Sequence, residues 1–341
     1  MTRTLTAAVA GTALLLAAAG CGTTSVDSQT RRAMTTEEDF LHAMEQLSNH
    51  GRWGEGDGLG AANFITPAKR KAAAALVTEG ISVSLAHDII QEPALEGQWY
   101  LDRQVVNVSE TGASDRLQYT GTYHGVIHSH LDSVACHVMF EGVGYNGITA
   151  EDVKAADGCP QGSIHELRDG IFTRGVLFDA TLLPGLDEDG NGWVEPGTAI
   201  RYADLEELER IQGVTVEEGD VILLHTGRWA RRAALGPWDP NEEGVAGYHA
   251  DVAYFLKDRG VSFIGADMWN DAFPHEFSDA VRLPIHRLAL VSLGVSIFDN
   301  LDLDGVAATA RELGRYEFLF TAAPLRIEKG MGSPLNPIAT F

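Results

Sequence analysis

The sequence is poor in cysteine and in basic residues. Three cysteines in 341 residues, Cys21, Cys136 and Cys159, exclude a scaffold built on disulfides. For Cys136 and Cys159 we expect two buried thiols, and the alternative is one bridge in an oxidising compartment. The 25 Lys and Arg residues stand against 48 Asp and Glu residues, which gives a formal charge of -23. Such a chain repels phosphate backbones and anionic lipids, so we expect no nucleic-acid partner.

One uncharged run of Ala, Leu and Val lies near the start of the chain. It belongs to "MTRTLTAAVAGTALLLAAAGCGTTS", which has the layout of a signal peptide over residues 1–20 and is too short for a membrane span. The Cys directly after "LAAAG" resembles the lipobox of bacterial lipoproteins, which predicts a lipid on Cys21. An ordinary secretory signal or a mis-assigned start codon is the alternative. We therefore expect an exported protein that meets the membrane only through this anchor, or else a secreted one.

The rest of the chain is predicted to form one domain. Residues 21–36 are polar and aperiodic, as in a flexible tether, and no linker, charge block or repeat interrupts residues 37–341. Caps and apolar periodicity predict helices at 66–80 and 202–213, buried strands at 221–227, 261–267 and 288–300, and antiparallel pairing near 117–132. Helices that alternate with buried apolar strands indicate an α/β fold with a mixed sheet.

Histidine is concentrated in "HGVIHSHLDSVACH", residues 124–137. If residues 124–132 are extended, their side chains alternate between two faces. One face then carries His124, Val126, His128, His130 and Asp132. Imidazole nitrogens and a carboxylate suit zinc, manganese or iron(II) better than calcium or magnesium. The pattern predicts a transition-metal site, and the alternative is a histidine-rich strand that binds no metal.

The sequence also resembles a known family over nearly the whole of residues 37–341. Its "HSHLDSVACH" is similar to the signature His-x-Gly-Thr-His-x-Asp-x-Pro-x-His of the metal-dependent cyclase family, which includes bacterial kynurenine formamidase and isatin hydrolase. Further similar segments follow in the same order, among them "DGIFTRGVLFD", "DVILLHTGRW" and "PIHRLALVSLGVSIFDNLDL". The resemblance implies a single α/β domain of the swivelling β/β/α type, a hydrolase with one or two zinc or manganese ions per chain, and a homodimer or homotetramer.

The resemblance also implies roles for individual residues. His130 and Asp132 would be metal ligands, His286 and Asp299 would complete a second metal position, and His137 would donate and accept protons. Trp53 would contact substrate.

The signature is not matched throughout. Val126 stands where the signature has its first His, and we hypothesise that His128 takes over as ligand or lines the substrate pocket. Asp299 replaces a Glu that is one methylene longer, which could leave the second metal position weak or empty.

Two loops offer further candidates. "GADMWNDAFPHEF", residues 265–277, follows a buried strand, where α/β proteins collect polar groups, so Asp267 and Trp269 are predicted to contact substrate. "DEDGNG", residues 187–192, opens like a calcium loop but has Thr198 at the twelfth position, so we expect a simple acidic loop.

Taken with the resemblance, the sequence predicts a metal-dependent hydrolase that cleaves an amide, lactam or ester bond of a small aromatic or cyclic substrate. The alternative is an envelope protein that binds a small molecule on the same fold without catalysis.

Overall fold

The computed structural model describes the chain except for residues 2–33, 188 and 279–280. The predicted signal peptide, Cys21 and most of the tether lie outside the described residues and stay predictions. Met34 is already buried in the core, and Thr36 caps the first helix, so the residues just before position 37 belong to the folded body. None of the helices in the described part of the chain is long and apolar enough to span a bilayer.

A mixed nine-stranded sheet organises the described residues and confirms the predicted fold class. Its order is β1-β13-β11-β5-β7-β9-β10-β4-β12, in which the neighbours from β5 to β10 are parallel and the other pairs are antiparallel. The strands are β1 (Ser82–Ser84), β4 (His130–Asp132), β5 (Ile171–Asp179), β7 (Val221–His225), β9 (Phe263–Ala266), β10 (Ser296–Asp299), β11 (Glu317–Ala322), β12 (Gly332–Pro334) and β13 (Ile338–Thr340). Two short pairs lie outside it, β2 (Leu101–Ser109) with β3 (Gly112–Tyr119) and β6 (Ala199–Ile200) with β8 (Gly247–Tyr248).

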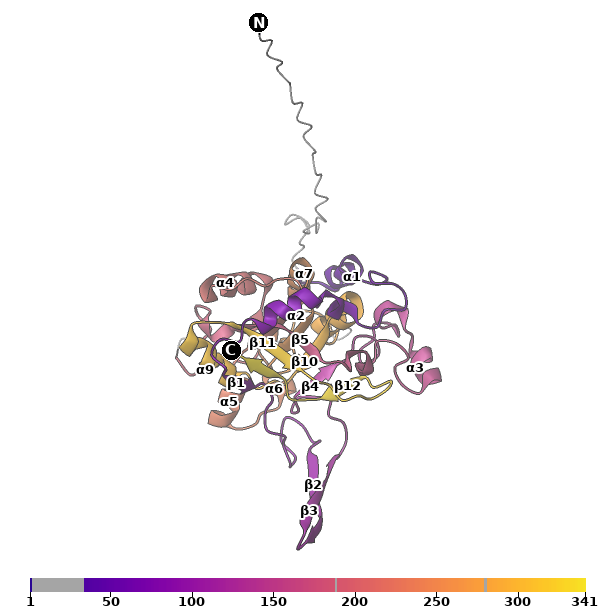
Figure 1. The fold of residues 1–341 in the computed structure, drawn as a ribbon, viewed down its shortest axis with the longest axis vertical. Helices are drawn as coiled ribbons and strands as arrows, with labels where there is room; N and C mark the ends of the chain where they lie inside the picture. Colours follow the sequence, from indigo (N-terminus) through magenta and orange to yellow (C-terminus); the bar gives the residue numbers. More distant parts are fainter. Residues whose placement is uncertain (2–33, 188, 279–280) are drawn as a thin grey trace. The chain divides into compact units, whose positions relative to one another are not determined.

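Helices cover both faces of the sheet (Figure 1). Ile222 and Leu224 of β7 enter the core under α1, α4 and α7, whereas Val221 and Leu223 enter the core under α9. This alternation is that of a strand buried on both sides. The helices are α1 (Glu37–Gln46), α2 (Pro67–Ala74), α3 (Ala150–Ala156), α4 (Tyr202–Gln212), α5 (Arg228–Leu235), α6 (Pro240–Glu243), α7 (Val252–Arg259), α8 (Pro284–His286), η5 (Arg287–Leu293) and α9 (Asp304–Leu313), with short 3-10 turns η1 (Gly60–Phe64), η2 (Tyr145–Gly147), η3 (Ile164–Leu167) and η4 (Ala180–Leu182).

Both predicted helices form, for the predicted reasons. The Thr66 hydroxyl accepts a hydrogen bond from the Lys69 backbone N–H, and Pro67 opens α2. This helix ends at Ala74, short of the predicted Gly80. Helix α4 ends at Gln212, and Gly213 caps it with a φ of +64°, a left-handed conformation that favours glycine.

The prediction of one strand over 288–300 is wrong for its first half. Residues 287–293 continue α8 as the helical segment η5, and only Ser296–Asp299 form the strand β10. Residues 288–293 are all buried, and an apolar run without polar gaps does not distinguish helix from strand. Gly294, with a φ of +65°, separates the two elements.

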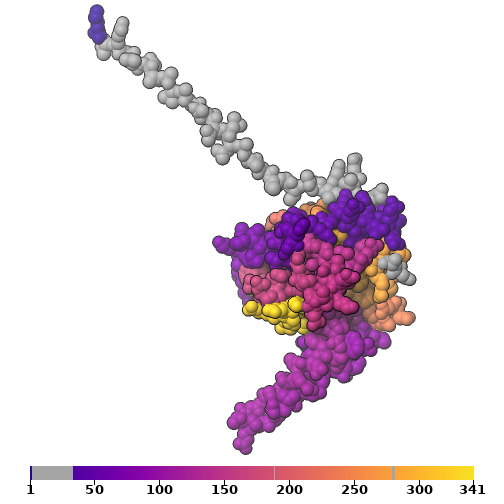
Figure 2. Space-filling model, turned by 90° about the vertical axis from the view of Figure 1, so that its right-hand side faces the viewer, coloured from indigo at the N-terminus to yellow at the C-terminus, as the bar shows by residue number. Residues whose placement is uncertain are grey.

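The extended run predicted over 124–132 is also shorter than expected. Strands β2 and β3 form a hairpin that projects from the body as an arm (Figures 1 and 2). Regular structure resumes at β4, and residues 120–129 between them form turns and bends. Gly125 has a φ of +127°, a conformation that breaks the alternation of faces.

The expectation of two free thiols is corrected by a disulfide between Cys136 and Cys159. Cys136 follows β4, and Cys159 follows α3 at a Cα separation of 5.7 Å, which lies within disulfide reach. Both residues are buried in a small apolar cluster with Val134, Ala135 and Tyr145. The bridge therefore fastens the loop that carries His137.

Candidate metal centre

Two paired strands and one helix bring together the residues of the candidate centre. His130 and Asp132 are two residues apart on β4, so their side chains share a face. Asp299 on β10 lies directly opposite His130 in the antiparallel ladder. His286 comes from the end of α8. All four side chains are buried.

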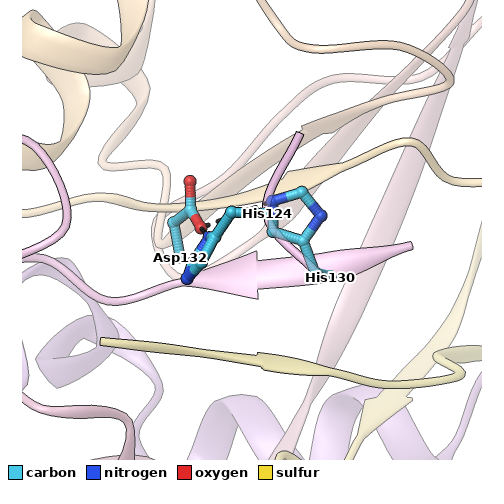
Figure 3. Close-up of side chains that lie close together, drawn as sticks. All are labelled: His124, His130 and Asp132. Carbon is cyan, nitrogen blue, oxygen red and sulfur yellow. Dashed lines mark ion pairs between the residues drawn. The ribbon is translucent and has the colours of Figure 1, made fainter. Parts of the chain in front are cut away.

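The first group of converging donor atoms comprises His124, His130 and Asp132 (Figure 3). His124 Nδ1 lies 2.9 Å from Asp132 Oδ1, and His130 Nε2 lies 3.5 Å from the same oxygen. One donor atom from each of the three residues lies within 4.8 Å of the others. This spacing can close around one cation.

The second group comprises Asp132, His286 and Asp299. His286 Nε2 lies 3.2 Å from Asp299 Oδ2 and 3.8 Å from Asp132 Oδ2. Asp132 belongs to both groups, with one carboxylate oxygen turned toward each. The two positions are therefore joined by a single side chain.

Hydrogen bonds outside the two groups orient their rings. His130 Nδ1 lies 2.7 Å from the His128 carbonyl oxygen, and His286 Nδ1 lies 2.5 Å from Asp271 Oδ2. When Nδ1–H donates to these oxygens, the Nε2 lone pair of each ring points into the centre, as a metal requires. The Asn270 amide fixes Asp299 by donating to its Oδ1 at 2.7 Å.

The chemistry of Asp132 fits a cation. Its side chain is fully buried, and neither carboxylate oxygen accepts a well-directed hydrogen bond. Burial favours the neutral acid, but His137 and His130 outweigh it and hold the pKa of Asp132 well below its usual range. A buried carboxylate whose oxygens accept no well-directed hydrogen bond is costly unless positive charge compensates it. Three imidazoles and two carboxylates are a donor set that suits zinc or manganese.

His137 lies at the more open side of the centre. Its Nε2 is 3.2 Å from Asp132 Oδ2, and its ring stacks on that of His124 at 4.0 Å. Burial and the neighbouring histidines outweigh the attraction of Asp132 and lower the pKa of His137 to about 4. Because a quarter of its side chain is exposed, it is placed to reach a molecule entering from solvent.

His128 does not reach the centre, in contrast to the prediction that it shares a face with His130. Its Nε2 lies 3.1 Å from the Trp99 carbonyl oxygen, and its ring packs edge-on against Tyr119 at 5.0 Å. The turn at Gly125 removes the alternation on which the prediction depended. His124, which the sequence analysis placed on the same strand face but did not assign as a ligand, lies in the first group of donor atoms instead.

The predicted substrate contacts lie in different places. Trp269 lines a cavity of about 610 Å³ beside the centre, together with Asp271 and Phe273. Trp53 packs edge-on against Phe64 at 5.2 Å and does not line this cavity. We therefore retain Trp269 and leave Trp53 out of the candidate site.

Asp267 supports the backbone instead of facing the cavity. Its fully buried carboxylate accepts hydrogen bonds from the backbone N–H groups of Thr226, Gly227 and Arg228 and from the Thr226 hydroxyl. These bonds give hydrogen-bond acceptors to backbone N–H groups at the start of α5.

The acidic loop predicted over 187–192 is also held by a carboxylate. Asp187 accepts hydrogen bonds from the backbone N–H groups of Asn191 and Gly192.

His225 forms a buried ion pair apart from the centre. Its two ring nitrogens lie 3.0 Å from Asp179 and 3.0 Å from Asp304, and Arg311 donates to Asp179 at 2.7 Å. Burial favours the neutral ring, but the hydrogen bonds to Asp179 and Asp304 outweigh it and raise the pKa of His225 to about 10. Since both nitrogens are occupied, we interpret this cluster as structural.

We expect His225→Gln to lower the free energy of unfolding by about 3 kcal/mol at pH 6, because the buried Asp179 carboxylate loses one of its two cationic partners and keeps only Arg311. The protonated His225 ring stabilises the fold. This contribution is complete below the pKa of an unfolded-state histidine, near 6.5, and it is lost as pH rises toward the folded-state pKa of about 10. The difference between parent and variant should therefore shrink at pH 9.5. Urea unfolding at both pH values measures it, with His165→Gln as the control. An equal loss at both values would contradict the ionised pair.

Comparison with known proteins shows which family shares this sequence and fold. The family model described as "Putative cyclase" matches residues 83–271, more than half of the chain and including β4 and the histidine-rich segment. The chain belongs to the cyclase family. A crystal structure described as a novel cyclase superposes with a TM-score of 0.73 at 28% identity, covering 87% of this chain and 99% of that one.

Two other sets of similar proteins match a smaller share of this cyclase-family chain. Kynurenine formamidases from two strains of Bacillus cereus are 28% and 27% identical over 155 residues, which is 45% of this chain and 66% of theirs. Isatin hydrolase A from Labrenzia aggregata, bound to benzyl benzoate, shares the fold with a TM-score of 0.53 at 19% identity, over 79% of this chain and 96% of that one.

Proposed function

We propose that this cyclase-family protein is a metal-dependent hydrolase that cleaves an amide, lactam or ester bond of a small aromatic or cyclic substrate. The observation that carries the proposal is the buried Asp132 carboxylate, surrounded by imidazoles from separate segments of the chain. The similarity to proteins named kynurenine formamidase supports hydrolysis of a C–N bond. The cavity beside the centre, with Trp269 and Phe273 in its wall, supports a planar or cyclic substrate.

The two groups of residues would hold one or two zinc or manganese ions per chain. His124, His130 and Asp132 form the first position, and Asp132, His286 and Asp299 form the second. A divalent cation held there would supply positive charge that makes a nearby water more acidic and polarises a carbonyl oxygen.

The residues of the chain supply the rest of the mechanism. The buried Asp132 carboxylate supplies negative charge between the two positions. Asp271 orients the His286 ring, and the His128 carbonyl orients the His130 ring. His137 accepts a proton from the attacking water at its Nε2 and returns it to the leaving amine or alcohol. Trp269 and Phe273 orient the substrate in the cavity and displace water from it.

We also propose that the protein acts outside the cytoplasm, as the layout of residues 1–25 predicts. The disulfide between Cys136 and Cys159 supports this location, because such bonds persist in oxidising compartments. Metabolic labelling with a lipid precursor, compared between the parent and Cys21→Ala, separates an anchored protein from a secreted one.

Elemental analysis of the parent, His130→Ala and His128→Ala tests the proposal. The proteins are purified without chelators or metal-affinity resin, and hydrolysis of a panel of amides, lactams and esters is measured in parallel. We expect one or two zinc or manganese ions per parent chain. His130→Ala should lose metal and activity together, whereas His128→Ala is a matched control that removes a neighbouring buried imidazole outside the centre and should keep its metal.

A parent protein that neither contains nor takes up a divalent metal would contradict the proposal. It would favour the alternative of a small-molecule-binding protein without catalysis. Equal metal loss in both variants would show that the two groups of residues are assigned wrongly.

A further inference from the structure

Helix α5 concentrates positive charge in an otherwise acidic chain. Its eight residues, "RWARRAAL", include Arg228, Arg231 and Arg232 and no acidic residue, whereas the whole chain carries -23. Arg232 forms a close ion pair with Glu96, which neutralises it. Arg228 and Arg231 instead line one small cavity beside the helix. The helix therefore brings two guanidinium groups to a single place.

Three N–H groups of these two arginines have no hydrogen-bond partner among the described residues. They are the Nε and Nη1 groups of Arg228 and the Nε group of Arg231, and all three are buried. Arg228 is only 3% exposed, so bulk water does not solvate its guanidinium. Buried donors on a cation are costly to leave unpaired, and such groups in native proteins generally have a partner. The three N–H groups therefore require an acceptor in the cavity that they share.

The carboxylates around α5 are engaged elsewhere. Glu96 Oε1 lies 3.9 Å from Arg228 Nη2, too far for a hydrogen bond, and the same oxygen pairs with the third arginine of the helix. Asp267 accepts from the backbone N–H of Arg228. Glu243 is 52% exposed and contacts Arg231 through Nη2 at 3.2 Å. Burial lowers the pKa of Arg228 to about 10, and Glu96 and Asp267 offset this effect only in part.

The cavity between the two arginines has the size of a single small ion. Its volume of about 10 Å³ leaves room for one water-sized group. The other lining residues are uncharged, and their side-chain acceptors are the Thr226 hydroxyl and the Met268 thioether sulfur. A water molecule needs good acceptors for its two hydrogens, whereas an anion needs donors alone. The lining therefore favours an anion over a water molecule.

We infer that this cavity binds a monatomic anion, chloride, between the guanidinium groups of Arg228 and Arg231. The ion accepts the three N–H groups that have no other partner, and its charge compensates the buried guanidinium of Arg228. Phosphate, sulfate and carboxylates are too large for the cavity. Chloride is slightly larger than water, and the Arg231 side chain, which is 12% exposed, can shift toward solvent to admit it.

Arg228 connects this anion site to the candidate metal centre. Its Nη2 donates to the Val126 carbonyl oxygen at 2.7 Å. Val126 lies two residues after His124 and lines the cavity beside the centre. An anion that fixes the Arg228 guanidinium therefore also fixes the turn from which His124 reaches Asp132. The anion site itself needs no metal and does not rest on the proposed hydrolysis.

The dependence of the melting temperature on chloride tests the inference. Chloride replaces gluconate from ~1 to ~200 mM at constant ionic strength, so that screening stays the same and only specific binding changes stability. We expect the melting temperature of the parent to rise by at least about 2 °C, with half of the effect reached below ~20 mM chloride.

Two arginine variants assign this rise to the cavity. Arg231→Met should lose the rise, because it removes one of the two guanidinium groups. Arg210→Met removes a 71% exposed arginine from α4 and is the matched control, which should keep the rise. A parent whose melting temperature does not depend on chloride, or an Arg231→Met variant with the full rise, would overturn the inference.

A chelated sample separates the anion site from the metal centre, since chloride can also bind to a metal ion. The same titration in the presence of chelator should give the same rise, because the residues of the cavity belong to neither group of donor atoms at the centre. A rise that disappears with the chelator would assign the effect to the metal and overturn the inference.

Bromide locates the ion without mutation. Crystals of the parent soaked in bromide, with data collected at the bromine absorption edge, should show an anomalous peak between the guanidinium groups of Arg228 and Arg231. Peaks at the protein surface alone would show an adventitious ion only. Density in the cavity without an anomalous signal would show a water molecule. Either of these two results would overturn the inference.

Discussion

Asp132→Asn is expected to abolish both metal binding and hydrolysis, with activity lowered at least about a thousandfold. Asp132 is the residue shared by the two groups of donor atoms, so its loss removes a ligand from each. Asn keeps the shape but offers one neutral oxygen in place of two charged ones. Metal content by elemental analysis and turnover of the best substrate from the panel measure the two effects.

Stability without metal distinguishes loss of a ligand from loss of the fold. In chelated protein the surrounding imidazoles still stabilise the Asp132 carboxylate, so Asp132→Asn should stay folded and unfold at the parental temperature or somewhat below it. Saturating zinc or manganese should then raise the melting temperature of the parent and leave that of the variant unchanged. A variant that binds metal with parental stoichiometry would contradict our assignment of the shared ligand.

His137→Ala is expected to keep its metal and lose most turnover, by about a hundredfold to ten-thousandfold. His137 is near enough to the centre to exchange protons there, at 3.2 Å from Asp132 Oδ2, yet it belongs to neither group of converging donor atoms. The expected change is therefore in kcat, with metal content at the parental value. Elemental analysis and steady-state kinetics on the same preparation measure both.

Added imidazole gives this prediction a sharper readout. It should restore part of the activity of His137→Ala, because the removed ring leaves space on the open side of the centre, and should not restore that of His130→Ala. His165→Ala, which removes a ring from η3, is the matched control and should behave like the parent. If His137→Ala loses its metal, the residue is a ligand; if it turns over at the parental rate, the proton-transfer role is wrong.

Sequence reasoning located part of the centre because that part depends on short-range geometry. Two residues on one strand point the same way whatever surrounds them, which places His130 and Asp132 together. His124 depends on the turn at Gly125, and this turn interrupts an otherwise extended pattern. The glycine directly after His124 was the available signal, since a glycine within an alternating stretch indicates a bend.

The remaining errors have one physical origin. The helical segment Arg287–Leu293 and the strand that follows are equally apolar, so their boundary is set by what packs around them. The disulfide forms because the segment after α3 returns toward the segment after β4. The place of Trp53 in the fold is likewise decided by its packing against Phe64. Composition and spacing within a segment do not contain these long-range contacts. The fold class could be predicted because alternation of helices and buried strands is repeated along the chain.

The pairing of β4 also determines when the centre can form during folding. His130 is opposite Asp299 on one side and Pro334 on the other, so this three-residue strand joins segments more than 160 positions apart. Such contacts close large loops and form late. A chain still emerging from the ribosome holds His130 and Asp132 long before Asp299 exists. The proposed second metal position, which needs Asp299, would therefore form late in folding. The rate of metal uptake at that position during refolding would report assembly of the sheet.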